Sequence, residues 1–227
     1  MKAVLKFGGS ILAPNSVDFE FLEKLASSVS NWSAEHELAI VVGGGKLSRE
    51  FGKAGKKFTK DPRLLDLIGI QASRFVASTL ISALDQNACP EVPRSEAEFI
   101  ALTKAHPGKI IVAGGFRPGQ RTDAVAVEIA KTWGAELVVK GTDVDYVYDS
   151  DPKKNKDAKP LETISYEELK KLGDQEHEAN KATIMDKVAA EMLAESKIKM
   201  AIVNGKDLAN IEKILSNQEF TGTRIGF

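Results

Sequence analysis

Hydrophobic and polar positions follow two different spacings along the chain. Short unbroken apolar runs are typical of parallel strands that are covered on both faces. Between them, apolar residues recur every three or four positions, as in helices with one buried side. This alternation predicts an α/β fold with a mostly parallel central sheet and helices on both faces. The expected strands are 3–7, 38–42, 110–113, 136–140, 200–203 and 223–227, and the expected helices are 18–32, 46–57, 63–85, 123–133, 180–195 and 209–215, with a short helix opening at the capping box Ser165–Glu168.

Glycine clusters directly follow four of the predicted strands. Because the carboxyl ends of parallel strands meet at one edge of a sheet, we expect all four clusters at the edge where ligands bind in open α/β folds. A glycine between a strand and a helix frees backbone N–H groups to hold an anion at the positive end of the helix. Close packing of the strand against the helix is the alternative explanation for any one loop. The clusters are Gly8–Gly9, Gly43–Gly45, Gly114–Gly115 and Gly141.

The glycine triplet does not match two well-known phosphate loops. A Walker A loop would need glycine and Ser or Thr at the positions of Ile40 and Leu47. A dinucleotide-binding loop would need a third glycine at the position of Ser48. The four clusters therefore have to be interpreted together.

Composition excludes several classes of function. The 227 residues suffice for one large α/β domain. A formal net charge of −1 gives no general basic field, so we expect no nucleic-acid partner. The single cysteine, Cys89, rules out an internal disulfide and a CxxC metal site. The chain opens on a strand-like segment and shows no apolar run of about 18 residues, so we expect a cytoplasmic protein without a membrane partner.

Four motifs in this order resemble the amino acid kinase family, whose members transfer a phosphoryl group from ATP to a carboxylate, carbamate or phosphate. The resemblance spans essentially the whole chain. The motifs are "KFGGS" at 6–10, "VVGGGKLSR" at 41–49, "GGFRPGQRTDAVA" at 114–126 and "GTDVDYVYDSDP" at 141–152.

Two motifs narrow the resemblance within the family. "LDLIGIQASR" at 65–74 and "GGFRPGQ" at 114–120 are most similar to uridylate (UMP) kinases of the archaeal type. This resemblance implies ATP and UMP as substrates and Mg²⁺ bound with ATP. It also implies a homohexamer of single-domain chains, each with an acceptor-binding lobe at about 1–135 and an ATP-binding lobe at about 136–227.

The resemblance assigns roles to particular residues. Lys6 would neutralise charge on the transferring group, and Arg49 would present its planar fork to a phosphate. Asp123 would either organise the catalytic lysines or cap its helix. The implied catalytic residues are thus Lys6, Arg49 and Asp123. The implied ATP-binding residues are Lys6, Phe7, Gly8, Gly9, Ser10, Gly45, Arg49, Thr142, Tyr148 and Asp151, and the implied UMP-binding residues are Gly44, Asp66, Gly114, Gly115, Phe116, Arg117, Pro118, Gly119, Gln120, Arg121 and Thr122.

Two further residues bear on the site. Asp66 is a lone carboxylate in an apolar helical stretch, which would be costly to bury without a partner, and the resemblance supplies a ribose hydroxyl of UMP. Lys187 matches the place where acetylglutamate-kinase-like relatives have a second phosphate-binding lysine. No carboxylate cage for a metal is evident, so Mg²⁺ would be held mainly by phosphates and water.

Two other functions remain open from the sequence. One is a family kinase acting on a carboxylate or on isopentenyl phosphate; the isopentenyl phosphate enzymes have a histidine shortly after the glycine triplet, and "GGGKLSRE" has none. The other is a non-catalytic nucleotide-sensing module. The presence of Lys6, Arg49 and Asp66 argues against that second alternative.

Overall fold

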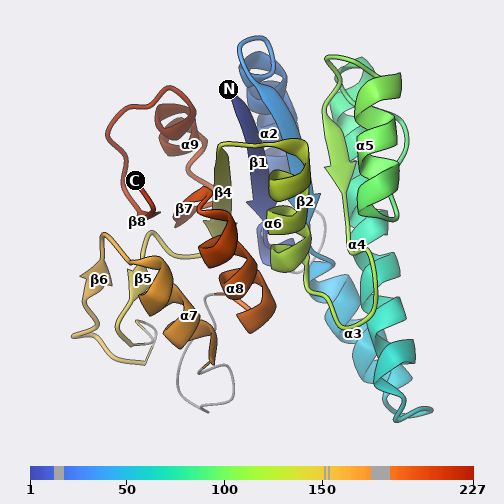
Figure 1. Ribbon diagram of the computed structural model, residues 1–227. Coiled ribbons are helices and arrows are strands. Elements are labelled where there is room, and N and C mark those ends of the chain that lie inside the picture. The colour runs from blue at the N-terminus through green and yellow to red at the C-terminus, as the bar shows by residue number, and fades with distance from the viewer. Residues whose placement is uncertain (13–17, 151, 153, 175–184) are drawn as a thin grey trace.

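The computed structural model describes residues 1–12, 18–150, 152, 154–174 and 185–227. Its core is a six-stranded sheet in the order β3-β2-β1-β4-β7-β8 (Figure 1). Neighbouring strands pair in parallel, except that β8 runs antiparallel to β7. The strands are β1 Lys2–Phe7, β2 Glu37–Val42, β3 Ile111–Ala113, β4 Leu137–Thr142, β7 Lys199–Asn204 and β8 Thr223–Ile225, and a separate hairpin-like pair is formed by β5 Val147–Tyr148 and β6 Pro160–Leu161.

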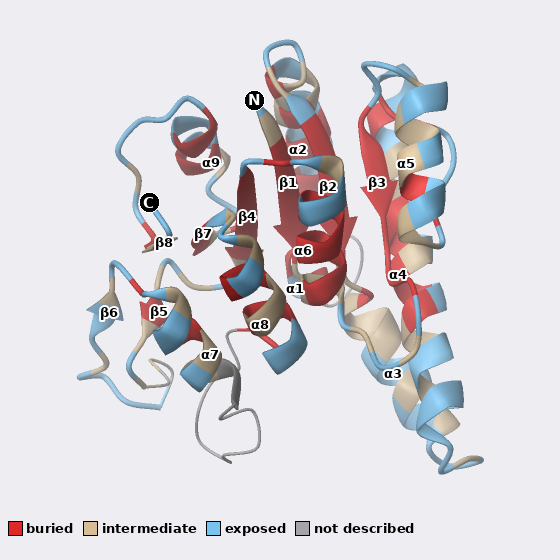
Figure 2. Cartoon of the chain, viewed as in Figure 1, coloured by how far each residue is buried: buried red, intermediate tan, exposed pale blue. Residues whose placement is uncertain are grey.

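Helices cover both faces of this sheet. On one face, residues such as Leu25, Leu80 and Ile211 pack in a single apolar cluster, and on the other face Val127 and Leu193 belong to a second. Figure 2 shows the strands between them as almost wholly buried, which confirms the predicted three layers. The first face is covered by α1 Gly9–Leu12, α2 Phe19–Trp32, α4 Pro62–Leu84 and α9 Leu208–Leu215, and the second by α5 Glu96–Ala105, α6 Thr122–Trp133, α7 Tyr166–Asp174 and α8 Lys187–Ser196.

The strand order places a ligand-binding crevice next to β1. From β1 the chain moves to β2 and then β3 on one side, and then returns to β4 on the other side of β1. Such a reversal leaves a crevice at the carboxyl ends of the two central strands. The predicted glycine loops, and the start of α3 (Gly45–Gly55), lie at this edge.

The structure differs from the predicted elements in several places. Helices α1 and α5 and the 3-10 turn η1 (Asp85–Asn87) were not expected; in α5 only Phe99 is fully buried, so its apolar pattern is weak. Helix α8 begins at Lys187 rather than at 180, with Asp186 as its N-cap, while 180–184 lie outside the described residues. The capping box is confirmed, because Glu168 N donates to Ser165 Oγ at 3.2 Å and Ser165 N donates to the Glu168 carboxylate at 2.8 Å.

Helix α4 has apolar side chains that stay exposed, in addition to those that pack in the core. Within the described part of the chain, Pro62–Asn87 alone is long and apolar enough to cross a membrane by length and composition, which is weak evidence because core helices pass the same test. Its buried side, including Val76 and Leu80, packs toward the sheet. Leu64, Leu67 and Phe75 are 48%, 40% and 65% exposed, so an apolar strip faces outward.

Candidate active site

Two buried lysines share one carboxylate at the carboxyl edge of the sheet. Lys6 Nζ lies 2.9 Å from Asp123 Oδ1, and Lys140 Nζ lies 2.9 Å from Asp123 Oδ2. The side chains of Lys6 and Lys140 are only 9% and 7% exposed. Two ammonium groups around one carboxylate leave a net positive charge at the bottom of the crevice, where an anion would be stabilised.

Strand register brings the two lysines together. Lys6 near the end of β1 pairs directly with Lys140 near the end of β4. Side chains alternate between the faces of a strand, so paired residues point to the same face. That face is covered by α6, which supplies Asp123 as its second residue, whereas Arg121 is the N-cap. Asp123 is therefore not the helix cap; its carboxylate contacts the two lysines, and its role in catalysis stays a prediction.

Burial and the neighbouring positive charges shift the pKa of the Asp123 carboxyl in opposite directions. Burial alone would raise its pKa, but the positive charges of Lys140 and Lys6 outweigh that effect and hold the pKa well below its usual range. Burial lowers the pKa of Lys140, and the nearby charge of Lys6 adds to this, while Asp123 opposes it. The carboxylate is thus ionised at neutral pH and keeps both ammonium groups in place.

Lys140 was missed by the sequence interpretation, although a signal for it exists. It lies near the end of an apolar strand and immediately precedes Gly141, much as Lys6 lies near the end of β1 shortly before Gly8. Lys187, which matches the second phosphate-binding lysine of acetylglutamate-kinase-like relatives, has a side chain that is 58% exposed, and its Nζ lies 3.9 Å from Glu191 Oε1 on its own helix. The structure places Lys140, not Lys187, beside Lys6.

Asp186 also borders this cluster and was not predicted. Its Oδ1 accepts from Ala189 N at 3.0 Å, whereas its buried Oδ2 has no hydrogen-bond partner among the described residues. Burial raises the pKa of its carboxyl, and the charge of Asp123 raises it further, while Arg121 and Lys140 oppose the shift.

Two helices begin at the crevice without a side-chain cap. Neither α3, with Gly44 at its N-cap, nor α6, with Arg121, has a capping side-chain hydrogen bond, whereas α2, α4, α5, α8 and α9 each have one. Gly45, the first residue of α3, has a φ of +55°, which glycine adopts without strain. The uncapped N–H groups of α3 and α6 are suited to binding an anion.

Several glycines at the crevice are required by the protein itself. A Cβ on Gly9 would lie 1.9 Å from Gly45 N, and one on Gly44 would lie 2.7 Å from Ser48 Cβ. At Gly8 the nearest atom would be 3.6 Å away, which is an ordinary contact. The expectation that a missing Cβ makes room for phosphate thus fits Gly8, while close packing explains Gly9 and Gly44. Their contacts with substrate stay predictions.

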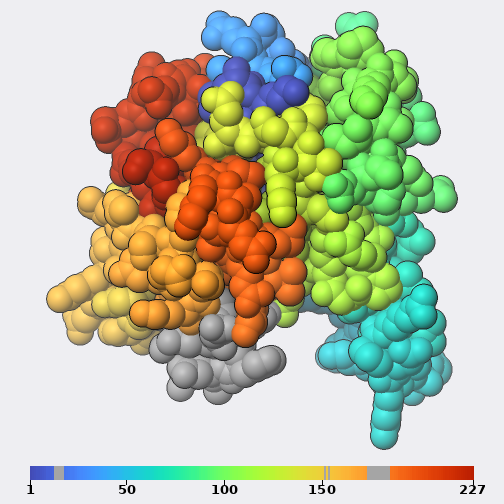
Figure 3. Space-filling view, viewed as in Figure 1, coloured from blue at the N-terminus to red at the C-terminus, as the bar shows by residue number. Residues whose placement is uncertain are grey.

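A cavity of about 730 Å³ opens beside the lysine cluster, between α3, α4 and the loop after β3. Figure 3 shows the α3 and α4 ends projecting from the body of the molecule, with a hollow beside them. Nine predicted site residues share this cavity: Gly44, Gly45, Arg49, Asp66, Gly115, Gln120, Arg121, Thr122 and Asp123. Its other lining residues, which were not predicted, are Ser48, Gly52, Lys53, Lys56, Leu65, Gly69, Ile70 and Ser73.

Residues 114–122, here called the acceptor loop, are fixed to α4 by hydrogen bonds. Gly115 N donates to Ser73 Oγ at 2.8 Å, and Arg74 donates to the carbonyls of Gly115 and Phe116 at 3.0 and 3.1 Å. Gly119 N donates to Asp66 at 2.7 Å, so the protein itself supplies a partner for that carboxylate. The motif 65–74 therefore has a structural role, and the contact of Asp66 with a ribose stays a prediction.

The amino acid kinase family model matches residues 1–204. The chain belongs to the amino acid kinase family. It is 41% identical over 217 residues to a uridylate kinase of Pyrococcus abyssi, covering 95% of each chain, and 39% identical over 222 residues to that of Thermococcus kodakarensis, covering 96% of each.

Solved structures agree with this membership. Uridylate kinase from Archaeoglobus fulgidus superposes with a TM-score of 0.88 at 33% identity, covering 99% of this chain and all of that one. An isopentenyl phosphate kinase superposes with a TM-score of 0.75 at 24% identity, which shows a shared fold alone. The amino acid kinase fold predicted from the motifs is confirmed.

Other residues implied by the family resemblance lie in more varied surroundings. Phe7 and Phe116 are 1% and 6% exposed and pack in the two apolar cores, so only their backbones are available to a ligand. Thr142 Oγ1 donates to Val144 O at 2.8 Å and shapes the turn after β4. Tyr148 packs edge-to-face against Tyr146, with ring centroids 6.4 Å apart.

Three further predicted residues are at least partly exposed or lie outside the residues that the structure describes. Ser10 is an exposed residue of α1, next to the crevice, and Pro118 is half-buried in the acceptor loop. Asp151 lies outside the described residues. Roles for all three in this family member stay predictions.

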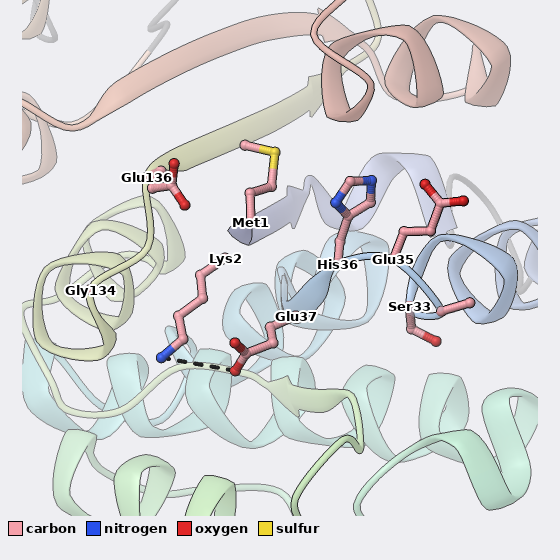
Figure 4. Close-up of a pocket in the computed structure, with 9 residues that line it drawn as sticks. Met1, Lys2, Ser33, Glu35, His36, Glu37, Gly134 and Glu136 are labelled. Carbon is pink, nitrogen blue, oxygen red and sulfur yellow. Dashed lines mark ion pairs between the residues drawn. The ribbon is translucent and has the colours of Figure 1, made fainter.

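A second hollow, of about 530 Å³, lies at the opposite, amino edge of the sheet (Figure 4). Lys2 and Glu37 form an ion pair of 3.9 Å there. Burial lowers the pKa of His36, and the charge of the N-terminus lowers it further, so this histidine is neutral at physiological pH. None of the predicted site residues lines this hollow.

Proposed function

We propose that the protein is a uridylate kinase, which transfers the γ-phosphoryl group of ATP to UMP and yields ADP and UDP. The observation that carries this proposal is the Lys6–Asp123–Lys140 cluster adjoining a cavity that also contains Arg49 and Asp66. Relatives near 40% identity over almost the whole chain are uridylate kinases, which supports UMP as the acceptor.

The reaction needs positioning and charge neutralisation rather than a protein nucleophile. In this proposal, Lys6 and Lys140 stabilise the negative charge that spreads over the transferring phosphoryl group. Arg49, the fifth residue of α3, holds the acceptor phosphate through its planar guanidinium, and Asp66 orients the acceptor sugar. The uncapped starts of α3 and α6 add backbone donors on the same side.

Mg²⁺ enters this proposal as part of the MgATP substrate. The described residues contain no group of three or more His, Cys, Asp or Glu suited to hold a metal ion. Phosphate oxygens and water would thus be its principal ligands. We further propose an acceptor-binding lobe at about 1–135, an ATP-binding lobe at about 136–227, and a cytoplasmic location without nucleic-acid or membrane partners.

Acceptor choice tests the proposed function. In a coupled assay of ADP release, we expect strong turnover with UMP, weak turnover with CMP and little with AMP, GMP, carbamate, acetylglutamate or isopentenyl phosphate. Higher turnover with isopentenyl phosphate or a carboxylate would assign the chain to another kinase of the family. Nucleotide binding without turnover of any acceptor would instead identify a sensing module.

We also propose that the chain forms a homo-oligomer, a hexamer by family resemblance. The exposed apolar strip of α4 supports self-association, because a soluble chain rarely leaves such a strip uncovered. Light scattering is expected to give about six times the 24.6 kDa chain mass. Phe75→Ser should lower that mass, whereas Phe227→Ser, at a 52% exposed residue near the C-terminus, should not. A monomer for the unmodified chain would contradict the proposal.

A further inference from the structure

Glu128 is a buried charge in an apolar helix. Seven consecutive residues of α6, Ala124–Ala130, are buried, and Glu128 is the charged one among them, with 8% of its surface exposed. A carboxylate in such a place is costly unless charged or polar groups pair with it. Its partners therefore indicate what it does.

Both partners of Glu128 come from the acceptor loop. Arg117 Nη1 donates to Glu128 Oε1 at 2.8 Å, and Gln120 Nε2 donates to the other oxygen, Oε2. Each carboxylate oxygen thus fixes one side chain of the same short stretch. Arg117 and Gln120 are two of the residues expected to contact the acceptor, and in the structure one side-chain nitrogen of each is bound to Glu128, while the buried Oε1 of Gln120 has no hydrogen-bond partner among the described residues.

The acceptor loop is held from two sides. Ser73 and Arg74 of α4 bind its beginning through the backbone at Gly115, and Asp66 binds Gly119. On the side of α6, Glu128 binds residues 117 and 120. Gly115 and Gln120, together with 121 and 122, line the 730 Å³ cavity, so these attachments define one of its walls.

We propose that Glu128 is a positioning residue for the phosphoryl acceptor. By holding Arg117 and Gln120, it gives the acceptor loop its binding shape before the acceptor arrives. Without this hold, acceptor binding would have to order the loop, and affinity for the acceptor would fall. The Lys6–Asp123–Lys140 cluster would be unchanged, so transfer from a saturated complex would continue. This inference rests on the proposed function.

Glu128→Gln tests the proposal, because it keeps the shape of the side chain and removes its charge. We expect the KM and Kd for the acceptor to rise about tenfold, as for the loss of one charge-assisted hydrogen bond. The kcat and the KM for ATP should stay within about twofold. Glu212→Gln, at an exposed residue of α9, is the matched control. It should leave the KM and Kd for the acceptor, the kcat and the KM for ATP unchanged.

Hydrogen exchange on the ligand-free protein gives a readout that needs no activity. Peptides covering 115–121 should exchange faster in Glu128→Gln than in the unmodified protein, while peptides from β1 and β4 should not. Unchanged exchange together with an unchanged acceptor KM would overturn the proposal. An equal rise in the KM for ATP would also overturn it, since that indicates a general loss of structure.

A double-mutant cycle separates positioning from direct contact. If Glu128 acts through Arg117, then Arg117→Met combined with Glu128→Gln should raise the acceptor KM no more than the stronger single change does. If the fold-increases in acceptor KM of the two single variants multiply in the double variant, Arg117 binds the acceptor independently of Glu128, and the proposal is overturned. If Glu128→Gln does not fold, Arg117→Met, whose side chain is 57% exposed, and Gln120→Met carry the test by hydrogen exchange of 115–121.

The acceptor in these measurements is the compound with the highest turnover in the assay of the unmodified protein. If that compound is not UMP, the proposed function fails while the test of Glu128 proceeds with the other acceptor. If UMP is phosphorylated but Glu128→Gln leaves its KM and the loop exchange unchanged, only the role of Glu128 fails.

Discussion

Replacing Lys6 with alanine is expected to lower kcat roughly 100-fold or more, the usual cost of removing one preorganised donor to charge that develops in a transition state. The KM for UMP should change little, because Lys6 is proposed to act on the group in transfer and not on the bound acceptor. The fold should survive, since Asp123 keeps its 2.9 Å contact with Lys140 and is not left as an unpaired buried charge.

Lys140→Ala extends this test, because the structure gives both lysines the same partner and nearly the same burial. It should lower kcat to a comparable extent. Lys213→Ala, at an exposed residue of α9, is the control and should leave kcat unchanged. Steady-state kinetics with UMP and ATP, after circular dichroism has confirmed folding, decides the outcome. If Lys6→Ala raises only the KM for UMP, the proposed orientation of donor and acceptor in the crevice is wrong.

The layers of the fold were predictable because they depend on local patterns. Buried strands such as β1 and β2 read as unbroken apolar runs, and the glycines that follow them mark the carboxyl edge. The pairing of Lys6 with Asp123 was weighed against a helix cap. Lys140 was missed because its local signal, a lysine just before Gly141, does not show which residue it faces; strand register places it beside Lys6. Register depends on which strands become neighbours, and that is settled only when the whole sheet assembles.

The contacts that hold the acceptor loop also could not be predicted from local sequence patterns. The motif of this loop predicted that it wraps the acceptor; Gly115 and Gln120 line the cavity, and their contact with an acceptor stays a prediction. Glu128 was not predicted, because in sequence it is one acidic residue in a helical segment, which is usually a solvated position. Only the packing of α6 against the sheet and its neighbouring helices buries it beside Arg117. A buried charge is recognised only from its tertiary contacts. These contacts depend on many residues that are far apart in the sequence.

A large loss of thermal stability is expected at one of two adjacent glycines, Gly8 and Gly9, which no sequence pattern distinguishes. A methyl group on Gly9 would lie 1.9 Å from Gly45 N and 2.7 Å from Gly43 O, so the loops after β1 and β2 would have to separate. Backbone cannot move aside as a flexible side chain can. We expect Gly9→Ala to cost at least about 3 kcal/mol, at the upper end for overpacked sites, which corresponds to a fall in Tm of roughly 6–12 °C or more.

Gly8→Ala is the matched comparison, since its methyl group would meet only Ser10 Oγ at 3.6 Å and Gly141 O at 3.8 Å. Its Tm should stay close to that of the unmodified protein. If Gly8 lies against the ATP phosphates as proposed, the same methyl group should hold them away from the backbone donors and raise the KM for ATP. Thermal unfolding and steady-state kinetics on the pair thus separate a glycine needed by the protein from one needed by its substrate. A Gly9→Ala protein with normal Tm would show that the two loops are not packed as described, and a Gly8→Ala protein with normal ATP kinetics would remove that loop from the proposed ATP site.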